Sequence, residues 1–380
     1  MPEENYEKFM AEAIALAEES RFSTYPNPAV GAVLVKDGAV VARGRHRGAG
    51  MPHAEIECLE DARSRGIDPA GTTLVVTLEP CVHYGKTPPC SDAILAAGIK
   101  TLVYGCEDPN SEAAGGARLL AEKGVEVIGP VLKQECEDLI ADFRVWREGR
   151  RPYVILKLAC TLDGRIATRS GHSKWISDES ARKDVHRLRS AIGKTGGAIL
   201  IGGGTFRGDN PALTYRLDEE KDAPQPLACV LTSRLPKADA DFHLLTERPK
   251  DTVFFASPAA TASTAAEALR KLGCRIFAVG PSRKGGPDFD KMFAEIKEDL
   301  HCPYVLCEGG GKLAFSLLRA GFIDEFHLHM APIILGDNEA TPLFNGNMPL
   351  SLEDGLSLRF CKTFIRDNNA RLLLRPATKE

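Results

Sequence analysis

Apolar runs typical of buried strands alternate with amphipathic helical patterns along most of this chain, and that alternation limits its fold more than any other feature. Residues 30–44 hold two apolar runs joined by Asp37-Gly38, a dipeptide that favours the positive φ of a tight hairpin turn. Further strands are predicted at 73–78, 101–105 and 125–128, and helices at 5–19, 53–65, 91–97, between the last two strands, and at about 134–147. This order predicts an α/β layer with largely parallel pairing after the hairpin.

The alternation starts again beyond the charged segment EGRRP at 148–152. We expect strands at 153–159, 198–201, 227–231, 253–256, 276–279, 304–307 and 325–330, and helices at 178–190, 262–272, 289–298 and 312–320. The tail after about 355 has weaker, strand-like character. A length of 380 residues suits two domains. We therefore predict an α/β chain with domains at 1–147 and 148–380.

Charge and cysteine usage exclude several classes of protein. A net charge of -4 argues against a main partner that is a polyanion, and no apolar run approaches the roughly 20 residues needed to cross a bilayer. The acidic N-terminus is unlike a signal peptide. Eleven cysteines are spread along the chain in no dense framework, which favours reduced thiols and a cytoplasmic location.

The first domain contains a candidate metal site. His53 belongs to the motif His-Ala-Glu, and Cys81 and Cys90 lie in TLEPCVHYGKTPPC. One imidazole and two thiolates suit a tetrahedral Zn²⁺ with one open position, which a catalytic zinc needs. A closed structural site would need a fourth ligand, for which Cys58 is the nearest candidate. Chance occurrence of three such residues is the remaining alternative.

Glu55 is placed to act beside this metal without binding it. Zinc lowers the pKa of bound water to about 7. Glu55 lies two residues after His53, near the predicted start of a helix, and could take the proton of that water. It could then protonate a ring nitrogen and the departing ammonia. The order H-x-E followed by P-C is that of zinc nucleobase deaminases, although eight residues instead of two separate these cysteines.

Asn27-Pro28, His-Ala-Glu and EPCxHxGKTPPC together resemble the deaminase half of the bifunctional riboflavin-biosynthesis deaminase/reductases. The resemblance implies a cytidine-deaminase-like three-layer αβα domain acting on a diaminopyrimidinone with a ribosylamino 5′-phosphate. It also implies that the pyrimidine and ribose-phosphate pocket is lined by Asn27, His46, His83 and Lys86. One loop departs from the family pattern: DPNSEAAGGARLL has Ser111 and Gly116 where Pro and Arg are common.

Glycine-rich stretches in the second domain fail the usual nucleotide motifs. Gly193-Lys194-Thr195 lacks the first glycine of a phosphate-binding loop, and Arg207 replaces the last glycine of G-x-G-x-x-G. Gly309-Gly310-Gly311 lies between a predicted strand and a predicted helix. Its backbone amides could bind a phosphate at the helix N-terminus, or it could be a plain turn.

The strings LKLACTLDGRIA, SKWIS, TFRGDNPALTYR and CEGGGKLA resemble, in this order, the reductase half of the same family, which has a dihydrofolate-reductase-like α/β fold. The resemblance implies cofactor contacts with NADPH from Ala159, Trp175, Thr205, Asp209, Gly310, Gly311, Lys312, Leu313, Ala314, Phe315 and Ser316. It implies substrate contacts from Lys157, Ser173, Arg189, Leu213, Arg216 and Glu308. The two arginines would clamp the phosphate, because guanidinium binds phosphate oxygens in pairs.

The leading hypothesis is a two-site enzyme that deaminates the pyrimidine and then reduces its ribosyl group to ribityl, using Zn²⁺ and NADPH. Asp209 would be the reductase proton donor or would stabilise the developing iminium. Its partners would be this small molecule and further copies of itself in a homo-oligomer, without nucleic acid or membrane. One alternative is a nucleic-acid base deaminase with an accessory domain. Another is a zinc-stabilised NADPH-binding regulatory module, which would have no use for Glu55.

Overall fold

The computed structural model describes residues 3–84, 88–217, 223–283, 285–346 and 351–377 of the chain. It divides into two compact units, Met1–Gly149 and Arg150–Glu380. The boundary lies two residues after the one predicted from the charged segment. None of the helices formed by the described residues is long and apolar enough to cross a membrane.

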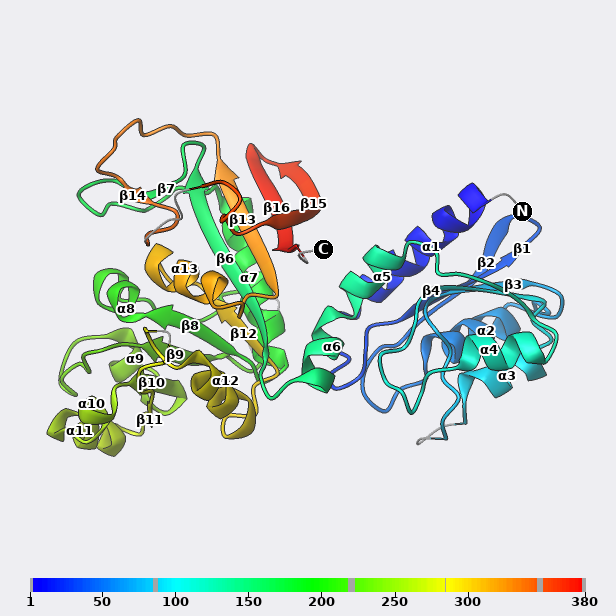
Figure 1. Cartoon of the computed structure of the whole chain (residues 1–380), viewed down its shortest axis with the longest axis horizontal. Coiled ribbons are helices and arrows are strands. Elements are labelled where there is room, and N and C mark those ends of the chain that lie inside the picture. Colours follow the sequence, from blue (N-terminus) through cyan, green and yellow to red (C-terminus); the bar gives the residue numbers. More distant parts are fainter. Residues whose placement is uncertain (1–2, 85–87, 218–222, 284, 347–350, 378–380) are drawn as a thin grey trace. The chain divides into compact units, whose positions relative to one another are not determined.

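The first unit contains a five-stranded sheet with the order β2-β1-β3-β4-β5 (Figure 1). The bounds are β1 Gly31–Lys36, β2 Ala39–Arg45, β3 Thr73–Leu78, β4 Thr101–Cys106 and β5 Glu126–Ile128. Asp37 and Gly38 have φ of 51° and 77°, so the predicted hairpin turn is confirmed. β1 is antiparallel to both of its neighbours, and β3, β4 and β5 are parallel. β2 therefore runs in the same direction as β3.

Helices cover both faces of this sheet, as the three-layer prediction requires. They are α1 Glu3–Glu18, α2 Ala54–Ser64, α3 Cys90–Ala96, α4 Gly116–Glu122, α5 Lys133–Leu139 and α6 Ala141–Glu148. α1 and α5 lie on one face, and α2, α3 and α4 on the other (Figure 1). A Cβ on Gly31 would lie 2.1 Å from the carbonyl oxygen of Ala13, and one on Gly44 would lie 2.3 Å from that of Ala54. Glycine therefore lets α1 and α2 approach the strands closely.

The single helix predicted at about 134–147 is wrong. Ile140 has φ -104° and ψ 15°, outside helical geometry, and divides the segment into α5 and α6. The hydrophobic pattern continues across this break, because Cys136, Leu139, Ile140 and Phe143 are all buried. A periodic pattern thus shows which side faces the core but not where the backbone bends.

The second unit contains a nine-stranded sheet with the order β11-β10-β9-β8-β12-β6-β13-β16-β15. The bounds are β6 Tyr153–Thr161, β8 Ala198–Gly202, β9 Leu227–Leu231, β10 Thr252–Ala256, β11 Arg275–Ala278, β12 Tyr304–Cys307, β13 Glu325–Ala331, β15 Leu358–Arg366 and β16 Asn369–Pro376. The strands from β11 to β13 are parallel, and the tail adds β16 and β15 antiparallel at one edge. The weak strand signal of the tail is therefore confirmed.

The helices of the second unit are α7 Glu179–Lys194, α8 Gly203–Asp209, α9 His243–Thr246, α10 Pro258–Thr261, α11 Thr264–Leu272, α12 Phe289–Glu298 and α13 Gly311–Arg319, with a short 3-10 helix at Pro249–Asp251. The predictions missed α8, α9, α10, the 3-10 helix and the two-stranded sheet of β7 (Arg165–Ala167) and β14 (Thr341–Pro342). Each of these elements is too short to show a hydrophobic period, and α8 begins with two glycines.

Parallel pairing places the carboxyl ends of neighbouring strands at one edge of each sheet. In the first unit β2, β3 and β4 end together, and they are followed by the segments that contain His53, Cys81 and Asp108. In the second unit β12 ends at Cys307, directly before Glu308 and the glycines. Ligands of open α/β sheets bind at this edge, so we expect the functional sites there.

Candidate functional site

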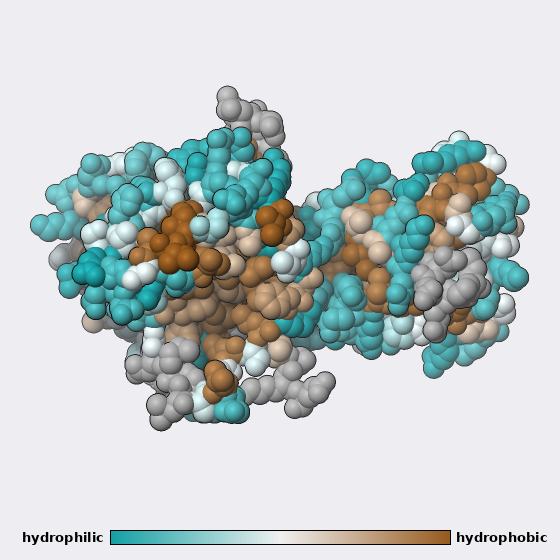
Figure 2. All heavy atoms as spheres, turned by 90° about the horizontal axis from the view of Figure 1, so that it is seen from above, coloured by the Kyte–Doolittle hydropathy of each residue, from teal (hydrophilic) through white to brown (hydrophobic). Residues whose placement is uncertain are grey.

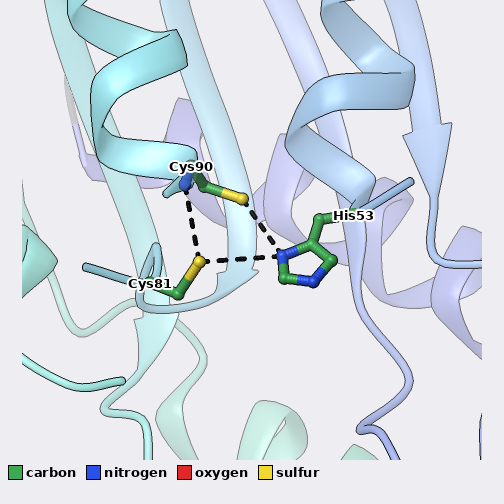
Figure 3. Close-up of side chains that lie close together, drawn as sticks. All are labelled: His53, Cys81 and Cys90. Atoms are coloured by element: carbon green, nitrogen blue, oxygen red, sulfur yellow. Dashed lines mark hydrogen bonds between the residues drawn. The ribbon is translucent and has the colours of Figure 1, made fainter. Parts of the chain in front are cut away.

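Three side chains meet beyond the carboxyl ends of β2 and β3 (Figure 3). His53 immediately precedes α2, Cys81 follows β3, and Cys90 begins α3. Nδ1 of His53 lies 3.2 Å from Sγ of Cys90 and 3.7 Å from Sγ of Cys81. All three potential ligand atoms lie within 4.8 Å of one another. The predicted set of metal ligands is therefore brought together.

The spacing of these atoms fits zinc. Bonds of about 2.3 Å to sulfur and 2.0–2.1 Å to nitrogen in a tetrahedron leave ligand atoms about 3.5 Å apart. The two sulfur–nitrogen distances, 3.2 and 3.7 Å, bracket that value. Cys58 is a buried residue of α2 and is not among the described residues that form the cluster, so the hypothesis of a closed four-ligand site is wrong. Three ligands leave the fourth position for a reactant.

The protonation of the cluster favours cation binding. Hydrogen bonds from Cys90, then from His53, lower the pKa of the Cys81 thiol to about 4. The pKa of Cys90 is raised by its hydrogen bond to Cys81 and by burial. The pKa of His53 is raised by its hydrogen bond to Cys81. One thiolate thus already exists, and a divalent cation would displace protons from its two neighbours.

Glu55 lies in the first turn of α2, next to this cluster. Only 4% of its surface is exposed, and burial raises the pKa of its carboxyl group. The positive charge of His53 acts in the opposite direction. A buried carboxyl group with a raised pKa can exchange protons near neutral pH, as a general acid and base must.

Asn27 and His46 form a hydrogen-bonded pair beside the cluster. Nδ1 of His46 lies 2.9 Å from the carbonyl oxygen of Pro52, which can only accept, so Nδ1 has the hydrogen. Nε2 then accepts from Nδ2 of Asn27 at 3.1 Å. The His46 ring packs edge-on against His53, with 5.7 Å between their centroids. Burial lowers the pKa of His46, which keeps the imidazole neutral.

The two remaining predicted pocket residues of the deaminase half, His83 and Lys86, follow β3 in the sequence. His83 is exposed in the segment after β3, where its charge acts on Asp108. Lys86 lies outside the described residues. Asp108 was not predicted as a site residue, yet its negative charge acts on His53. Burial raises the pKa of this carboxyl group.

Glu79 is a second residue that sequence reasoning missed, although its motif TLEPC was recognised. Its carboxylate is buried, and it accepts backbone N–H groups from Gly115 and Ala117 at 3.1 Å and from Asp108 at 3.4 Å. Cys81 follows two residues later. Glu79 therefore connects two segments. One is the end of β3, which is followed by the metal ligand Cys81, and the other is the loop at 108–117.

The same loop forms one wall of the metal site. The carbonyl oxygen of Ala113 accepts the N–H of Val82 at 3.0 Å, and the Ala113 side chain packs against both cysteine ligands. A Cβ on Gly116 would lie only 1.9 Å from the carbonyl oxygen of Pro80. Glycine at position 116, which departs from the family pattern, is thus required by the close approach of this loop to the ligand segment.

In the second unit, Lys157, Arg189 and Glu308 form a half-buried charged cluster. Arg189 on α7 donates two hydrogen bonds to the Glu308 carboxylate, at 2.8 and 2.5 Å. It donates a third to the carbonyl oxygen of Thr214 at 2.8 Å. Burial lowers the pKa of Lys157 on β6 to about 8, an effect that Glu308 opposes and Arg189 reinforces. The structure brings these three predicted substrate residues together.

The two arginines of the predicted phosphate clamp have different surroundings. Arg189 is paired with Glu308, so its charge is largely neutralised. Arg216 is exposed, and its backbone N–H donates to Nδ1 of His186 at 3.2 Å. Leu213 is buried with φ 51°, and its carbonyl oxygen accepts from Arg248 at 3.1 Å. Leu213 therefore shapes the loop that presents Arg216.

The glycine turn and its neighbours form the predicted cofactor region. Gly310 donates its N–H to Oγ1 of Thr205 at 3.1 Å, and α13 starts at Gly311. Leu313, Ala314 and Phe315 have buried side chains that face the core, so only their backbone is left for a cofactor. Lys312 and Ser316 are exposed on the same helix. Asp209 is exposed at the end of α8.

The remaining predicted reductase residues are Ala159, Ser173 and Trp175. Ala159 is half-buried on β6, opposite His329 of β13. Ser173 is half-buried after β7. Trp175 is 67% exposed, so its ring is not part of the core. The guanidinium of Arg182 lies over its ring, 4.5 Å from the centroid, and holds an aromatic surface open to solvent.

The loops around this region are held by Asp163. Its carboxylate accepts from Oγ1 of Thr161 at 2.6 Å and from the N–H of Gly336 at 2.9 Å, which lowers its pKa to about 2. The next residue, Gly164, accepts the N–H of Leu343 through its carbonyl oxygen at 2.8 Å. The Asp163-Gly164 turn therefore anchors the segment after β13 and is more than a change of direction.

Comparison with known proteins identifies relatives of both units. Residues 3–106 match the cytidine and deoxycytidylate deaminase zinc-binding region, and residues 152–368 match the RibD C-terminal domain. The riboflavin biosynthesis protein RibD of Bacillus amyloliquefaciens is 38% identical over 93% of this chain and 92% of its own length. RibD of Escherichia coli K12 is 38% identical over 87% of this chain and 89% of its own length.

A solved structure resembles the whole chain. It is the diaminohydroxyphosphoribosylaminopyrimidine deaminase/5-amino-6-(5-phosphoribosylamino)uracil reductase of Thermotoga maritima, with a TM-score of 0.75 and 34% identity. The match covers 99% of both chains. One deaminase-like and one reductase-like unit therefore occur together, in this order, in a known protein.

Zinc binding should release protons, because the metal displaces the proton of Cys90, whose pKa is raised in the metal-free protein. We expect about one proton or more per zinc at pH 7.5 and tighter binding as pH rises. Calorimetric titration of the metal-free protein in buffers of different ionisation enthalpy measures this number. Zinc binding without proton release would contradict the assigned ligands.

Proposed function

Because the chain belongs to the RibD family of bifunctional riboflavin-biosynthesis enzymes, it is both a deaminase and a reductase, and we propose how its residues divide the two reactions. The first unit would deaminate 2,5-diamino-6-ribosylamino-4(3H)-pyrimidinone 5′-phosphate. The second would reduce the ribosyl group of the product to ribityl. The observation that carries the first assignment is the three-ligand cluster with Glu55 buried beside it.

Glu55 is the proton carrier of the proposed deamination. Zinc on His53, Cys81 and Cys90 supplies a Lewis acid that makes a water molecule nucleophilic near neutral pH. Glu55 takes a proton from the attacking water and gives it to the ring nitrogen beside the attacked carbon. It transfers the second proton to the departing amine, so that ammonia leaves and the carboxylate is restored.

Asn27 and the segment held by Glu79 would position the pyrimidine. The amide NH₂ of Asn27 faces His46, so its carbonyl oxygen is the atom available to accept from a ring N–H or amino group. The loop at 108–117 closes the pocket on the side of the two cysteines. Lys86 and His83 would bind the ribose phosphate, a role that suits a cation and a polar ring on the segment between the cysteines.

In the reductase site we propose that the glycine turn, Thr205 and Trp175 would hold NADPH, the reductant of this domain, which would supply hydride for C1′ of the ring-opened substrate. A proton must then reach the adjacent nitrogen. Asp209 is exposed, whereas Lys157 is half-buried and has a pKa of about 8. Lys157 is therefore the better proton donor of the two near neutral pH, and Asp209 would help to orient the substrate.

The alternatives of a nucleic-acid deaminase and of a regulatory module are not supported. Relatives that match more than four-fifths of this chain are riboflavin biosynthesis proteins, and Glu55 has the burial that acid–base chemistry needs. We propose a cytoplasmic location, because the eleven cysteines are free thiols and all but Cys361 are buried. Detection of the enzyme in an extracellular fraction of its cells would contradict this location.

We also propose a homo-oligomer formed through the second unit. β15 is an edge strand, and Phe360, Phe364 and Ile365 on it are 67%, 48% and 80% exposed. Figure 2 shows hydrophobic patches on the face of this unit that is turned to the viewer. An exposed apolar edge strand is a surface on which a second copy can be buried.

Glu55→Gln should retain zinc and lose ammonia release by about a hundredfold or more, because the amide cannot transfer protons. Ammonia production and zinc content are measured on the same protein, and NADPH oxidation with already deaminated substrate serves as the control. That control should not change, and it should also survive zinc chelation. Normal ammonia release would overturn the role of Glu55.

Arg216→Ala should raise KM of the reductase for its phosphorylated substrate by about tenfold, the usual effect of losing a charged hydrogen bond. KM for NADPH should stay the same. Initial rates of NADPH oxidation at varied concentrations of each reactant separate the two constants. A change confined to KM for NADPH would assign Arg216 to the cofactor.

Phe364→Asp together with Ile365→Asp should convert the assembly to monomers, because two buried charges would be costly at an apolar interface. Light scattering after size-exclusion chromatography gives the mass of both proteins. A monomeric unmodified chain at micromolar concentration would exclude the oligomer.

A further inference from the structure

His186 has a position that none of the assigned reductase roles uses. It lies on α7, three residues and therefore about one turn before Arg189, on the same side of the helix. Its Nδ1 accepts the backbone N–H of Arg216 at 3.2 Å. The imidazole thus lies one helical turn from Arg189 and against the backbone of Arg216, the two arginines proposed to hold the substrate phosphate.

The hydrogen bond from Arg216 fixes the tautomer of this ring. A backbone N–H can only donate, so Nδ1 is the acceptor and the hydrogen of the neutral imidazole is on Nε2. Nε2–H is a donor, and protonation of Nδ1 would break the hydrogen bond to Arg216. His186 is half-buried, so this donor belongs to the site and not to the bulk surface.

The charges around His186 suit a doubly charged anion. The groups whose charges act on it are Arg189, on its own helix, Arg216, on the adjoining loop, and Glu308, at the end of β12. Lys157 on β6 adds a positive charge that acts on Glu308. Three cations and one carboxylate give this set a net charge of two positive charges. A phosphate monoester has a charge of about -1.5 to -2 at pH 7, which would balance it.

We propose that His186 is a third ligand of the substrate phosphate in the reductase site, donating from Nε2 beside Arg189 and Arg216. We propose further that it takes up a proton on Nδ1 when the phosphate binds, a step in which the backbone N–H of Arg216 leaves Nδ1. This inference rests on the proposed function of the second unit. It makes His186 a residue that distinguishes the phosphorylated substrate from its dephosphorylated counterpart.

The electrostatics give the direction of the linkage. In the free protein, burial and then the charges of Arg189 and Arg216 lower the pKa of His186 to about 4, so the ring is neutral at pH 6. A bound phosphate places negative charge beside the ring and raises its pKa. The bound protein therefore holds more protons than the free protein as pH falls towards 6, and phosphate binding gains affinity in that range.

Two substitutions separate donation from protonation. His186→Gln keeps an oxygen that can accept from Arg216 and an amide donor, but it cannot become charged. His186→Ala removes both properties. His301→Asn is the matched control, because His301 is exposed before β12, at the opposite end of that strand from Glu308. Zinc-dependent ammonia release and KM for NADPH report whether each variant is folded.

The expected result is a pH-dependent loss of affinity for the phosphate. His186→Gln should raise KM of the reductase for its substrate by about tenfold at pH 6 and only slightly at pH 8, whereas His186→Ala should raise it at both. Titration of the phosphate itself affects every variant equally and cancels in the ratio. Calorimetry with ribose 5-phosphate at pH 6.5 should show proton uptake that His186→Gln reduces and His301→Asn does not, and ribose without phosphate should show none.

The failures can be told apart. If Arg216→Ala raises KM for the substrate but both His186 variants match the unmodified protein in KM and proton uptake, the phosphate site stands and the role of His186 is overturned. If neither Arg216→Ala nor the His186 variants change KM for the substrate, the proposed location of the phosphate is wrong, and this inference fails with it.

Discussion

Parallel pairing of neighbouring strands is the constraint on which the rest of this molecule depends. Parallel strands need crossover connections, so their carboxyl ends collect at one edge and the loops that follow them meet there. In the first unit these loops hold His53, Cys81 and Asp108, and in the second Glu308 follows β12 directly. Both sets of chemical groups are far apart in sequence and close in space because the sheets have this direction.

At both edges, buried charge is stabilised by a specific partner. Glu79 is satisfied by backbone N–H groups, whereas Glu308 is satisfied by Arg189. The first arrangement fixes a loop, and the second keeps a carboxylate ionised inside the protein. A chain with a net charge of -4 can thus still gather positive charge locally, because Lys157, Arg189 and Arg216 act on the same groups in the second unit.

The sequence was sufficient for the long elements and for the metal ligands, because hydrophobic period and ligand spacing are local properties. It was insufficient for helix breaks, for very short strands and for contacts between residues far apart in the sequence. The break at Ile140 lies within a continuous apolar pattern, and β7 and β14 are too short to show a period. The pairing of Arg189 with Glu308 joins residues 119 positions apart, so no local pattern could show that one arginine of the clamp was already engaged.

The last helix before the boundary contributes to the first site. Arg147 on α6 donates to Oδ1 of Asn110 at 2.7 Å and so orients the tip of the loop that Glu79 holds at its base. The first 140 residues already include the sheet and all three metal ligands, but not this guanidinium. A cut before Ala141 would keep the zinc ligands and the contacts of Glu79 but would remove the bond from Arg147 to Asn110. A division of the chain into separate polypeptides should therefore leave α6 with the first unit.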